Sequence, residues 1–590
     1  MSKIKVMDEL LANKIAAGEV VEKCVSIVKE LVENSIDANS DMIKIELKEA
    51  GLREIKVIDN GIGMDENDAV LAFQRHATSK LYSDDDLFSI SSLGFRGEAL
   101  PSIASVSEVV LKTCQNDIGH LVHIKGGTIL ESAKCEARVG TSITVSNLFY
   151  NTPARLKHLS SIYSELANIV EYVNKIALSY PSIKFILKND DKELLNTDGS
   201  GNLLKVIKTI YGTDVAKKMI KIDASNEDYT VSGYVSLPEV NRSSRNHMTT
   251  IVNGRVVRNA SLNKTVNDAY SSFKEDTRYP ISVLLIDTDP SLIDVNIHPS
   301  KQDIKFSNFD DLKSLISNSI IKEIKTKLLI PKIEIKDTDI PKYENLSLNL
   351  ERNIVKEPSN EYTQKISDVI NFNDDKNTLE EEVINYEYVE EIKDDNKLPE
   401  LYPIGLFLGT YIGCQNEKGI YLIDQHAAEE RINYEKYLYM LSHPNNNTIK
   451  PLFSIIIELP MNDFIIIKEN ISILDKLNIK VEEFGISSFR IVEHPTWFPK
   501  NREDKIIRNI FELIISSEKN FSFEKFNKNL AATIACKASI KGNTNITMEA
   551  MESIINDLRK CNNPFNCPHG RPTIISFTTY ELEKMFKRSM

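Results

Sequence analysis

The sequence lacks any long apolar run. No stretch reaches the about 18 consecutive apolar residues that a membrane-spanning helix needs. Charged residues interrupt the first segment every few positions, so we expect neither a signal peptide nor a lipid anchor there. The chain has 590 residues, of which 42% are hydrophobic and 27% charged. These values predict a soluble globular protein of about two to four domains, with no membrane partner.

Cysteine is also scarce. The seven cysteines form an odd, scattered set: Cys24, Cys114, Cys135, Cys414, Cys536, Cys561 and Cys567. This pattern in a long chain predicts a reducing compartment, which places the protein in the cytoplasm, associated with the nucleoid if it is bacterial. We therefore expect these thiols to serve metal binding or burial, and not disulfides.

An excess of positive charge is absent as well. Lys and Arg number 72 against 85 Asp and Glu, which gives a formal net charge of −13. Such a balance argues against nucleic-acid binding, because counterion release needs a basic surface. The acids are unevenly placed, however. They dominate residues 332–398, where apolar periodicity is missing, so this segment is predicted to be a disordered, charged linker. A solvated domain edge is the alternative.

The segment SIVKELVENSIDANS has the apolar spacing of a helix. At about 100° per residue, one side collects the apolar residues Val28, Leu31, Val32 and Ile36. Glu30, Asn34 and Asp37 fall together on the opposite side. Such a polar stripe is typical of a solvated helix face. It also fits a metal and water site in which Asn34 binds Mg²⁺ and Glu30 orients a water as general base.

The next segment, LREIKVIDNGIGM, predicts a strand that ends at Asp59 and is followed by two glycines. Asp-Asn-Gly is often only a turn. At a strand end, however, a lone carboxylate can accept a hydrogen bond from the amino group of adenine. The glycines, Gly61 and Gly63, would let the ring approach the backbone.

A glycine loop follows in LGFRGEAL, just before an apolar helix. Backbone N–H groups at such a position can wrap phosphates, although a glycine loop alone is weak evidence. Further along, Gly140 and Thr141 begin a predicted strand, and Lys301 lies in a loop after the strand SVLLIDTD.

Together these pieces resemble the GHKL ATPases, which include the ATPase domain of type II topoisomerases, a heat-shock chaperone and MutL. The MutL subgroup is indicated by ANKIAAGEVVE, KELVENSIDA, DNGIGM, RHATSK, LGFRGEAL, LFYNTPAR and VNIHPSK. The resemblance implies that ATP and Mg²⁺ are cofactors. Glu30 would be the general base and Asn34 the Mg²⁺ ligand. The other expected nucleotide-binding residues are Asp59, Gly63, Thr78, Gly94, Phe95, Arg96, Gly97, Leu100, Thr141 and Lys301.

A second candidate site begins in KGIYLIDQHAAEERINYEKY. A predicted strand continues there into a helix, with Asp424 and His426 at the junction. His426 and Glu430 are four residues apart and share one helix face, and Glu435 lies one turn further. Acids around an imidazole suit Zn²⁺ or Mn²⁺. An ordinary His–Glu surface pair has the same spacing.

Two later segments offer thiol ligands. TIACKASIK places Cys536 in a helix-like run, and NPFNCPHGRP places Cys567 and His569 between stiff prolines. A thiolate and an imidazole together favour zinc. Arg571 stands beside them and could hold a DNA phosphate.

DQHAAEERINYE resembles the DQHA-x2-E-x4-E pattern of MutL proteins that cut DNA, and ACK, CPHGRP and FKR resemble its companion motifs. The resemblance implies an endonuclease that uses Mn²⁺, Zn²⁺ or both, with Asp424, His426 and Glu430 as catalytic residues. The full expected metal set is Asp424, His426, Glu430, Cys536, Cys567 and His569.

Two positions depart from the family pattern. Leu406 stands where a glutamine is common. The segment Asn446–Pro451, expected to bind the replication sliding clamp, lacks its leading glutamine. The predicted clamp contact therefore rests on a degenerate motif.

The expected fold class is multidomain α/β (α+β). We expect a Bergerat GHKL ATPase domain at 1–210, a ribosomal-S5-like domain at 211–331, the linker at 332–398, and an α+β dimerisation and endonuclease domain at 399–590. No internal repeat, zinc finger or recognition helix is evident, so we expect double-stranded DNA to be bound without sequence preference. Candidate phosphate contacts are Arg155, Lys157, Arg255 and Arg258.

The function predicted from these features is DNA mismatch repair by a homodimer that works with a mismatch-recognition protein of the MutS type. ATP binding and hydrolysis would be coupled to metal-dependent nicking of DNA. The alternative is an ATP-dependent matchmaker with a structural zinc site that recruits a separate nuclease. A topoisomerase-like or chaperone-like machine is disfavoured by the DQHA and CPHGRP segments.

Overall fold

The computed structural model describes residues 18, 20–80, 93–94, 97–116, 118–273, 278–294, 304–328, 398–443, 447–500, 502–517, 522–539, 545–586 and 588. Three of the predicted nucleotide-binding residues, Phe95, Arg96 and Lys301, lie outside these ranges. So does the predicted linker apart from Leu398, which is buried in a hydrophobic core with strands of the C-terminal part.

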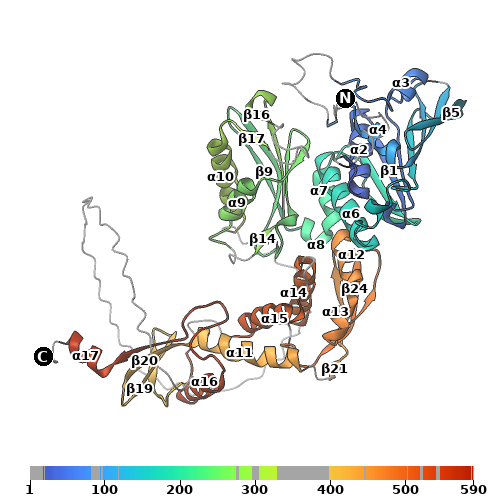
Figure 1. Ribbon diagram of the computed structural model, residues 1–590. Coiled ribbons are helices and arrows are strands. Elements are labelled where there is room, and N and C mark those ends of the chain that lie inside the picture. Colours follow the sequence, from blue (N-terminus) through green and yellow to red (C-terminus); the bar gives the residue numbers. More distant parts are fainter. Residues whose placement is uncertain are drawn as a thin grey trace, which may run out of the picture. The chain divides into compact units, whose positions relative to one another are not determined.

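The N-terminal part is built on an eight-stranded sheet with the order β5-β4-β3-β6-β2-β1-β7-β8 (Figure 1). Only β1 and β7 run parallel; the other neighbours are antiparallel. The strands are β1 Met42–Lys48, β2 Glu54–Asp59, β3 Glu108–Cys114, β4 Gly119–Lys125, β5 Thr128–Cys135, β6 Gly140–Ser146, β7 Lys184–Asn189 and β8 Lys192–Asn196. The helices of this part are α2 Cys24–Asp37, η1 Glu49–Gly51, α3 Glu66–Leu71, α4 Ala99–Val106, α5 Pro153–Leu156, α6 Ile162–Ser179, α7 Leu203–Tyr211 and α8 Thr213–Ala216.

Helix α2 is amphipathic, as its apolar spacing predicts. Its apolar side is buried, including Val28, Leu31 and Ile36, and it packs on β2 and α6. Glu30, Asn34 and Asp37 stay half-buried on the other side. The helix therefore holds a polar row fixed in place by a buried apolar one.

The second part contains a five-stranded sheet with the order β13-β12-β15-β10-β9, in which β12 and β15 run parallel. Helices α9 and α10 pack together, and α10 lies on β9 and β10 (Figure 1). Its elements are β9 Met219–Ser225, β10 Tyr229–Ser236, β11 Asn241–Arg242, η3 Arg245–His247, β12 Met248–Val252, β13 Arg255–Val257, α9 Ala260–Ala269, β14 Tyr279–Pro280, β15 Ser282–Thr288, η4 Pro290–Leu292, β16 Ile293–Asp294, β17 Lys305–Phe306 and α10 Phe309–Leu328.

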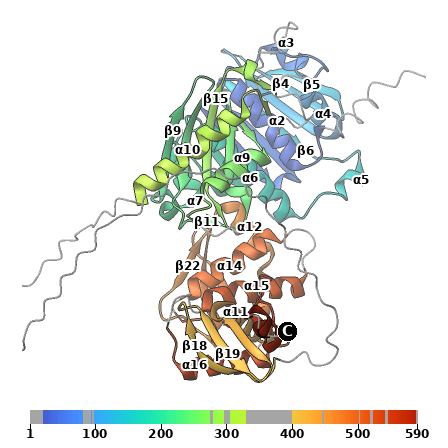
Figure 2. The same cartoon turned by 90° about the vertical axis from the view of Figure 1, so that its left-hand side faces the viewer.

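The C-terminal part has one antiparallel sheet, β18-β19-β20-β25, and a second in which β24 pairs with β21, β22 and β23. Helix α11 follows β20 directly and packs against α15 and α16 (Figure 2). The elements are β18 Tyr402–Phe407, β19 Tyr411–Asn416, β20 Gly419–Asp424, α11 Gln425–Ser442, β21 Thr448–Ile449, β22 Ile455–Glu458, α12 Met461–Glu469, α13 Ile471–Lys476, β23 Lys480–Glu483, β24 Ser488–Pro495, α14 Glu503–Ser516, α15 Phe523–Ala538, α16 Met548–Lys560, β25 Ile574–Thr578 and α17 Thr579–Met585.

Helices and strands are mixed in every part, which confirms the predicted α/β (α+β) fold class. All seven cysteines are free thiols, as predicted. Among the helices that the structure describes, none is both long and apolar enough to cross a membrane.

Candidate nucleotide and metal sites

The polar row of α2 faces two later segments of the chain. Lys80 Nζ lies 2.5 Å from Asp37 Oδ2 and donates to Asn34 Oδ1 at 3.2 Å. The backbone N–H groups of Leu93 and Gly94 donate to the two Asp37 oxygens at 2.9 and 3.1 Å. Asp37 therefore joins the end of α2 to both segments. A solvated helix face does not explain these contacts.

Glu30, the predicted general base, lies half-buried one turn before Asn34. Tyr172 of α6 lies behind this region, and its hydroxyl donates to the Lys29 carbonyl at 3.4 Å. Burial, reinforced by the negative charges of Glu33 and Glu30, raises the pKa of Tyr172 well above its usual range. Tyr172 therefore stays a neutral phenol on this side of the helix.

Asp59 lies buried at the end of β2, as predicted, and three donors hold it. Ser35 Oγ donates to Oδ2 at 2.8 Å, while the amides of Gly61 and Thr141 donate to Oδ1 at 3.0 and 3.1 Å. Burial raises the pKa of Asp59, and these hydrogen bonds only partly oppose the rise. The side chain is thus kept rigid in a position where it can accept a hydrogen bond from a ligand.

Two glycines near Asp59 have no room for a side chain. A Cβ on Gly140 would lie 2.2 Å from the Asp59 carbonyl oxygen, and one on Gly63 would lie 2.1 Å from that of Cys114. Both have positive φ, +116° and +66°. Thr113 links the two sides, because Met64 N donates to its hydroxyl and that hydroxyl lies 3.0 Å from the Thr141 hydroxyl. The predicted residues Asp59, Gly63 and Thr141 therefore share one locality.

The predicted phosphate-binding residues lie on two adjoining segments. His76 N donates to the Gly97 carbonyl at 3.2 Å, and a Cβ on Gly97 would lie 2.4 Å from the Ala77 carbonyl oxygen. Thr78 accepts from the Lys80 amide, and Leu100 is in the first turn of α4. The RHATSK and LGFRGEAL segments are thus neighbours, although the sequence separates them.

At the C-terminal site, the predicted strand and helix are present as β20 and α11. Asp424 is the N-cap residue of α11, with its Oδ1 accepting from Ala427 N at 3.0 Å. His426 Nε2 lies 3.5 Å from Glu430 Oε1 across one helical turn. Glu430 is only 5% exposed.

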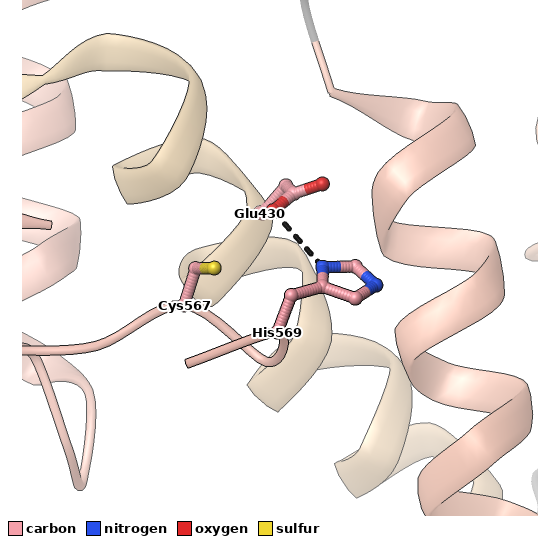
Figure 3. Close-up of side chains that lie close together, drawn as sticks. All are labelled: Glu430, Cys567 and His569. Carbon is pink, nitrogen blue, oxygen red and sulfur yellow. Dashed lines mark hydrogen bonds and ion pairs between the residues drawn. The ribbon is translucent and has the colours of Figure 1, made fainter. Parts of the chain in front are cut away.

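The loop after α16 brings Cys567 and His569 to Glu430 (Figure 3). His569 Nδ1 lies 3.4 Å from Glu430 Oε2. The ligand atoms of Glu430, Cys567 and His569 all lie within 4.8 Å of one another. Donors around a bound Zn²⁺ stand about 3.5 Å apart, so small side-chain rotations would close this group on a cation.

The other three predicted metal residues, Asp424, His426 and Cys536, lie outside this group in the part of the chain that is described. Asp424 uses its carboxylate to cap α11. Cys536 is exposed on α15, which packs on α11. Of the six predicted residues, the structure therefore groups Glu430, Cys567 and His569, and it places His426 3.5 Å from Glu430.

The predicted DNA-contacting residues differ in exposure. Lys157 and Arg258 are exposed, and Arg155 is half-buried. Arg258 lies 3.8 Å from Glu171. Arg255 is only 9% exposed, and burial lowers its pKa while Glu33, Tyr180 and Asp37 oppose that shift. Of the two arginines in VNGRVVRN, only Arg258 is therefore exposed at the surface.

Sequence reasoning did not assign Lys80 or Ser35 a role. Lys80 belongs to RHATSK, but its partners stand 43 and 46 positions earlier in the chain. Ser35 falls on the buried side of α2, where a small residue carries no functional signal.

The N-terminal fold is that of a GHKL-type ATPase. A family model described as "Histidine kinase-, DNA gyrase B-, and HSP90-like ATPase" matches residues 22–137. Models described as "DNA mismatch repair protein, C-terminal domain" and "MutL C terminal dimerisation domain" match residues 207–325 and 404–546.

Full-length relatives identify the family. The chain is 44% identical to DNA mismatch repair protein MutL of Geobacillus sp. (strain WCH70), over 100% of both chains. It is 44% identical to that of Listeria welshimeri over 99% of both chains, and 42% identical to that of Bacillus cereus (strain AH187) over 100% of both. The chain therefore belongs to the MutL family of DNA mismatch repair proteins, and it is a mismatch repair factor with an ATPase domain.

Solved structures also match the N-terminal half. One described as the N-terminal domain of a DNA repair protein has 26% identity and a TM-score of 0.46, covering 54% of this chain and 99% of its own. The Aquifex aeolicus MutL ATPase domain complexed with ADP has 24% identity and a TM-score of 0.36, covering 50% of this chain and 98% of its own.

Proposed function

We propose that this mismatch repair ATPase also nicks DNA, at a metal site on α11 and the Cys567 loop. The observation that carries the proposal is the convergence of Glu430, Cys567 and His569, with His426 one turn away on the same helix. A buried carboxylate, a thiol and two imidazoles are a donor set that suits Zn²⁺ or Mn²⁺.

At the N-terminal site, Asn34 would hold Mg²⁺ and Glu30 would orient the attacking water. Asp59 would accept from the adenine amino group, since its rigid carboxylate is buried at a strand end. Gly63, Thr78, Gly94, Gly97, Leu100 and Thr141 would line the nucleotide. The same roles are proposed for Phe95, Arg96 and Lys301.

At the C-terminal site, His426, Glu430, Cys567 and His569 would hold the cation, and Asp424 and Cys536 complete the proposed set. A bound cation would activate a water and stabilise the oxygen that leaves the DNA phosphate. The chain's own contribution is to fix this donor set on one helix and one loop. Exposed Arg571 is suited to hold the neighbouring phosphate.

The direct test is nicking of supercoiled plasmid with Mn²⁺ by wild type, Glu430→Gln and Asp424→Asn. Both variants should lose at least ~100-fold in nicking rate. Asn is as good an N-cap as Asp, so Asp424→Asn keeps α11 intact and its loss of activity cannot come from unfolding. Nicking by Glu430→Gln at the wild-type rate would refute the proposed site.

The burial of Glu430 and Cys567, 5% and 2% exposed, favours a second candidate function. Closed ligand sets are typical of structural zinc, and the protein would then be a matchmaker that recruits a separate nuclease. In that case wild type retains tightly bound zinc and does not nick DNA under any metal condition.

We propose that the chain works as a homodimer. The β18–β19 hairpin exposes large apolar side chains: Tyr402, Ile404, Phe407, Leu408 and Tyr411. Large exposed apolar side chains gathered in one hairpin suit an interface, and the matching C-terminal family model is described as a dimerisation domain.

The remaining partners follow from the family. We propose double-stranded DNA, a MutS-type mismatch sensor and the replication sliding clamp as partners. For the clamp, Asn446 lies outside the described residues, but Leu452 and Phe453, directly after this segment, are 92% and 82% exposed. Their exposure supports a docking role despite the missing glutamine. We also propose a cytoplasmic location, associated with the nucleoid in a bacterium. The four predicted domain ranges are proposed as well, with Leu398 assigned to the C-terminal domain because it is buried in that core.

A further inference from the structure

The last glutamate of the DQHAAEERINYE segment, Glu435, lies outside the group of candidate metal ligands. Its two carboxylate oxygens accept hydrogen bonds from consecutive backbone amides of the Cys567 loop. Asn562 N donates to Oε2 at 2.7 Å, and Asn563 N donates to Oε1 at 3.1 Å. Hydrogen bonds to a charged acceptor are roughly twice as strong as neutral ones. Glu435 therefore fixes the beginning of the loop on α11.

Arg431 provides a second attachment one helical turn earlier. Its Nε donates to the carbonyl of Asn566 at 2.5 Å, and its guanidinium lies 3.8 Å from Glu435 Oε1. Asn566 immediately precedes Cys567 in the chain. Arg431 is buried, so this contact is shielded from solvent and restrains the backbone next to the thiol.

The end of the loop returns to the start of the same helix. Thr573 is fully buried, and its amide donates to the Phe565 carbonyl at 2.9 Å. The Thr573 carbonyl accepts from Asp424 N at 2.9 Å. The loop between these points is closed by a hydrogen bond from Cys567 N to the Arg571 carbonyl at 2.8 Å. Both ends of the loop are thus attached to the segment that carries His426 and Glu430.

Helix α11 therefore uses two i, i+4 pairs for two purposes. His426 and Glu430 offer metal ligands, while Arg431 and Glu435, rotated by about 140° around the helix axis, hold the backbone that carries the other ligands. Ligand atoms must stay within about 0.5 Å of their working positions. A free loop would lose chain entropy each time it closed on a cation, and these attachments remove that cost beforehand.

We propose that Glu435, assisted by Arg431, is a positioning residue that preforms the Cys567–His569 loop for the metal. The role rests on the proposed metal site. Glu435 acts through the loop backbone, because both of its oxygens are used by Asn562 and Asn563. It is not itself a ligand.

The test uses the full-length protein with Co²⁺ or Zn²⁺ alone as the probe. Cobalt bound to a thiolate gives a charge-transfer absorption that reports the Cys567–metal bond directly. The variants are Glu435→Ala and Glu435→Gln, with Glu552→Ala as a control that removes an exposed acid from α16. Glu435→Gln keeps the side-chain shape and one acceptor for the loop amides, so it separates the loss of these hydrogen bonds from the loss of a charged metal ligand.

We expect Glu435→Ala to weaken Co²⁺ and Zn²⁺ binding about 10–100-fold, the usual effect of removing a group that orients a ligand. Glu435→Gln should recover part of that loss, and Glu552→Ala should match wild type. In metal-free protein, amide hydrogen exchange over residues 562–567 should accelerate in Glu435→Ala, while exchange in the body of α11 stays unchanged.

Three results would overturn the proposal. Unchanged affinity and absorption in Glu435→Ala would show that the loop needs no such attachment. Complete loss of one bound ion in Glu435→Gln, equal to the loss in Glu430→Gln, would show that Glu435 is a ligand. A wild-type protein that binds neither cation would refute the metal site itself, and the wild-type titration distinguishes that failure from the other two.

Discussion

At the scale of single residues, the functional carboxylates differ in how the fold treats them. Asp37 accepts hydrogen bonds from the Lys80 side chain and from two backbone amides. Asp59 accepts three hydrogen bonds and is still buried enough for its pKa to be raised. A charged group with that balance costs folding free energy at neutral pH. A buried carboxylate that costs folding free energy fits a ligand-binding role for Asp59.

Asp59→Asn should separate stability from nucleotide binding. The amide keeps an acceptor for Gly61 and Thr141, and its NH₂ can donate to Ser35. The NH₂ group of the asparagine would, however, face the adenine amino group, and two donors cannot form a hydrogen bond with each other. An unmatched buried donor costs about 1–3 kcal/mol, so ATP affinity should fall about 10–100-fold in a fluorescence titration.

The stability of the same variant has a defined pH dependence. Because the folded-state pKa of Asp59 is raised above 3.8, the wild-type protein gains stability as pH falls through that raised pKa towards 3.8. Asp59→Asn should therefore be at least as stable as wild type at pH 7, and its advantage should shrink as the pH approaches 4. A variant clearly less stable than wild type at pH 7 in thermal denaturation would contradict this reasoning.

Glu30→Gln tests the general base. Glutamine has nearly the same shape but cannot take a proton, so ATP turnover should fall about 10²–10⁴-fold while ATP still binds. Phosphate release measures the first quantity and nucleotide titration the second. Turnover near the wild-type rate would assign the base to another residue.

At the scale of secondary-structure elements, the way that neighbouring elements pack determines the shape of each site. The start of β6 packs closely against the end of β2, because a Cβ on Gly140 would overlap the Asp59 carbonyl oxygen. In the C-terminal part, α11 carries two of the proposed metal ligands and also the residues that hold the loop with the other two.

Gly140→Ala should damage the N-terminal sheet at the nucleotide site. The new Cβ meets backbone atoms, which cannot rotate away, and φ is +116° at this position. Overpacking and backbone strain of this kind cost about 1–3 kcal/mol. Thermal unfolding should report that loss, together with weaker ATP binding. Gly201→Ala is the matched control, because that glycine also has positive φ but nothing within 4 Å of its Cβ position.

At the scale of the whole molecule, the apolar surface of the β18–β19 hairpin is the feature that points to assembly. Leu408, in the turn of the hairpin, is 85% exposed and has a φ of +53°. Leucine is unfavourable there for two reasons: its apolar side chain is exposed to solvent, and the left-handed region favours Asn, Asp and Gly. An interface would account for it.

Leu408→Asp should therefore weaken dimerisation without harming the fold. Aspartate tolerates the left-handed backbone better than leucine, but a charge in an apolar interface should raise the dimer dissociation constant about 10–100-fold. Light scattering across a protein dilution series measures this change. Lys418→Gln changes the net charge by the same amount at the neighbouring hairpin and should leave the dimer intact. Unchanged dimerisation of Leu408→Asp would exclude this surface as the interface.

The sequence by itself determined the local features. Apolar spacing established α2 with its buried and polar sides, the strand ending at Asp59, and the passage from β20 into α11. It determined these because a helical or strand period is a property of residues adjacent in the chain. The motif resemblance led to the MutL family, which the full-length relatives then showed.

Only the tertiary structure decided which distant residues meet. It placed Lys80 on Asn34 and Asp37, put Arg255 inside the protein, and assigned Glu435 to the loop backbone. No period in the sequence could have given these results. Burial and pairing depend on how elements far apart in the chain pack against one another, and the side chain alone does not specify whether a carboxylate binds a cation, caps a helix or holds a loop.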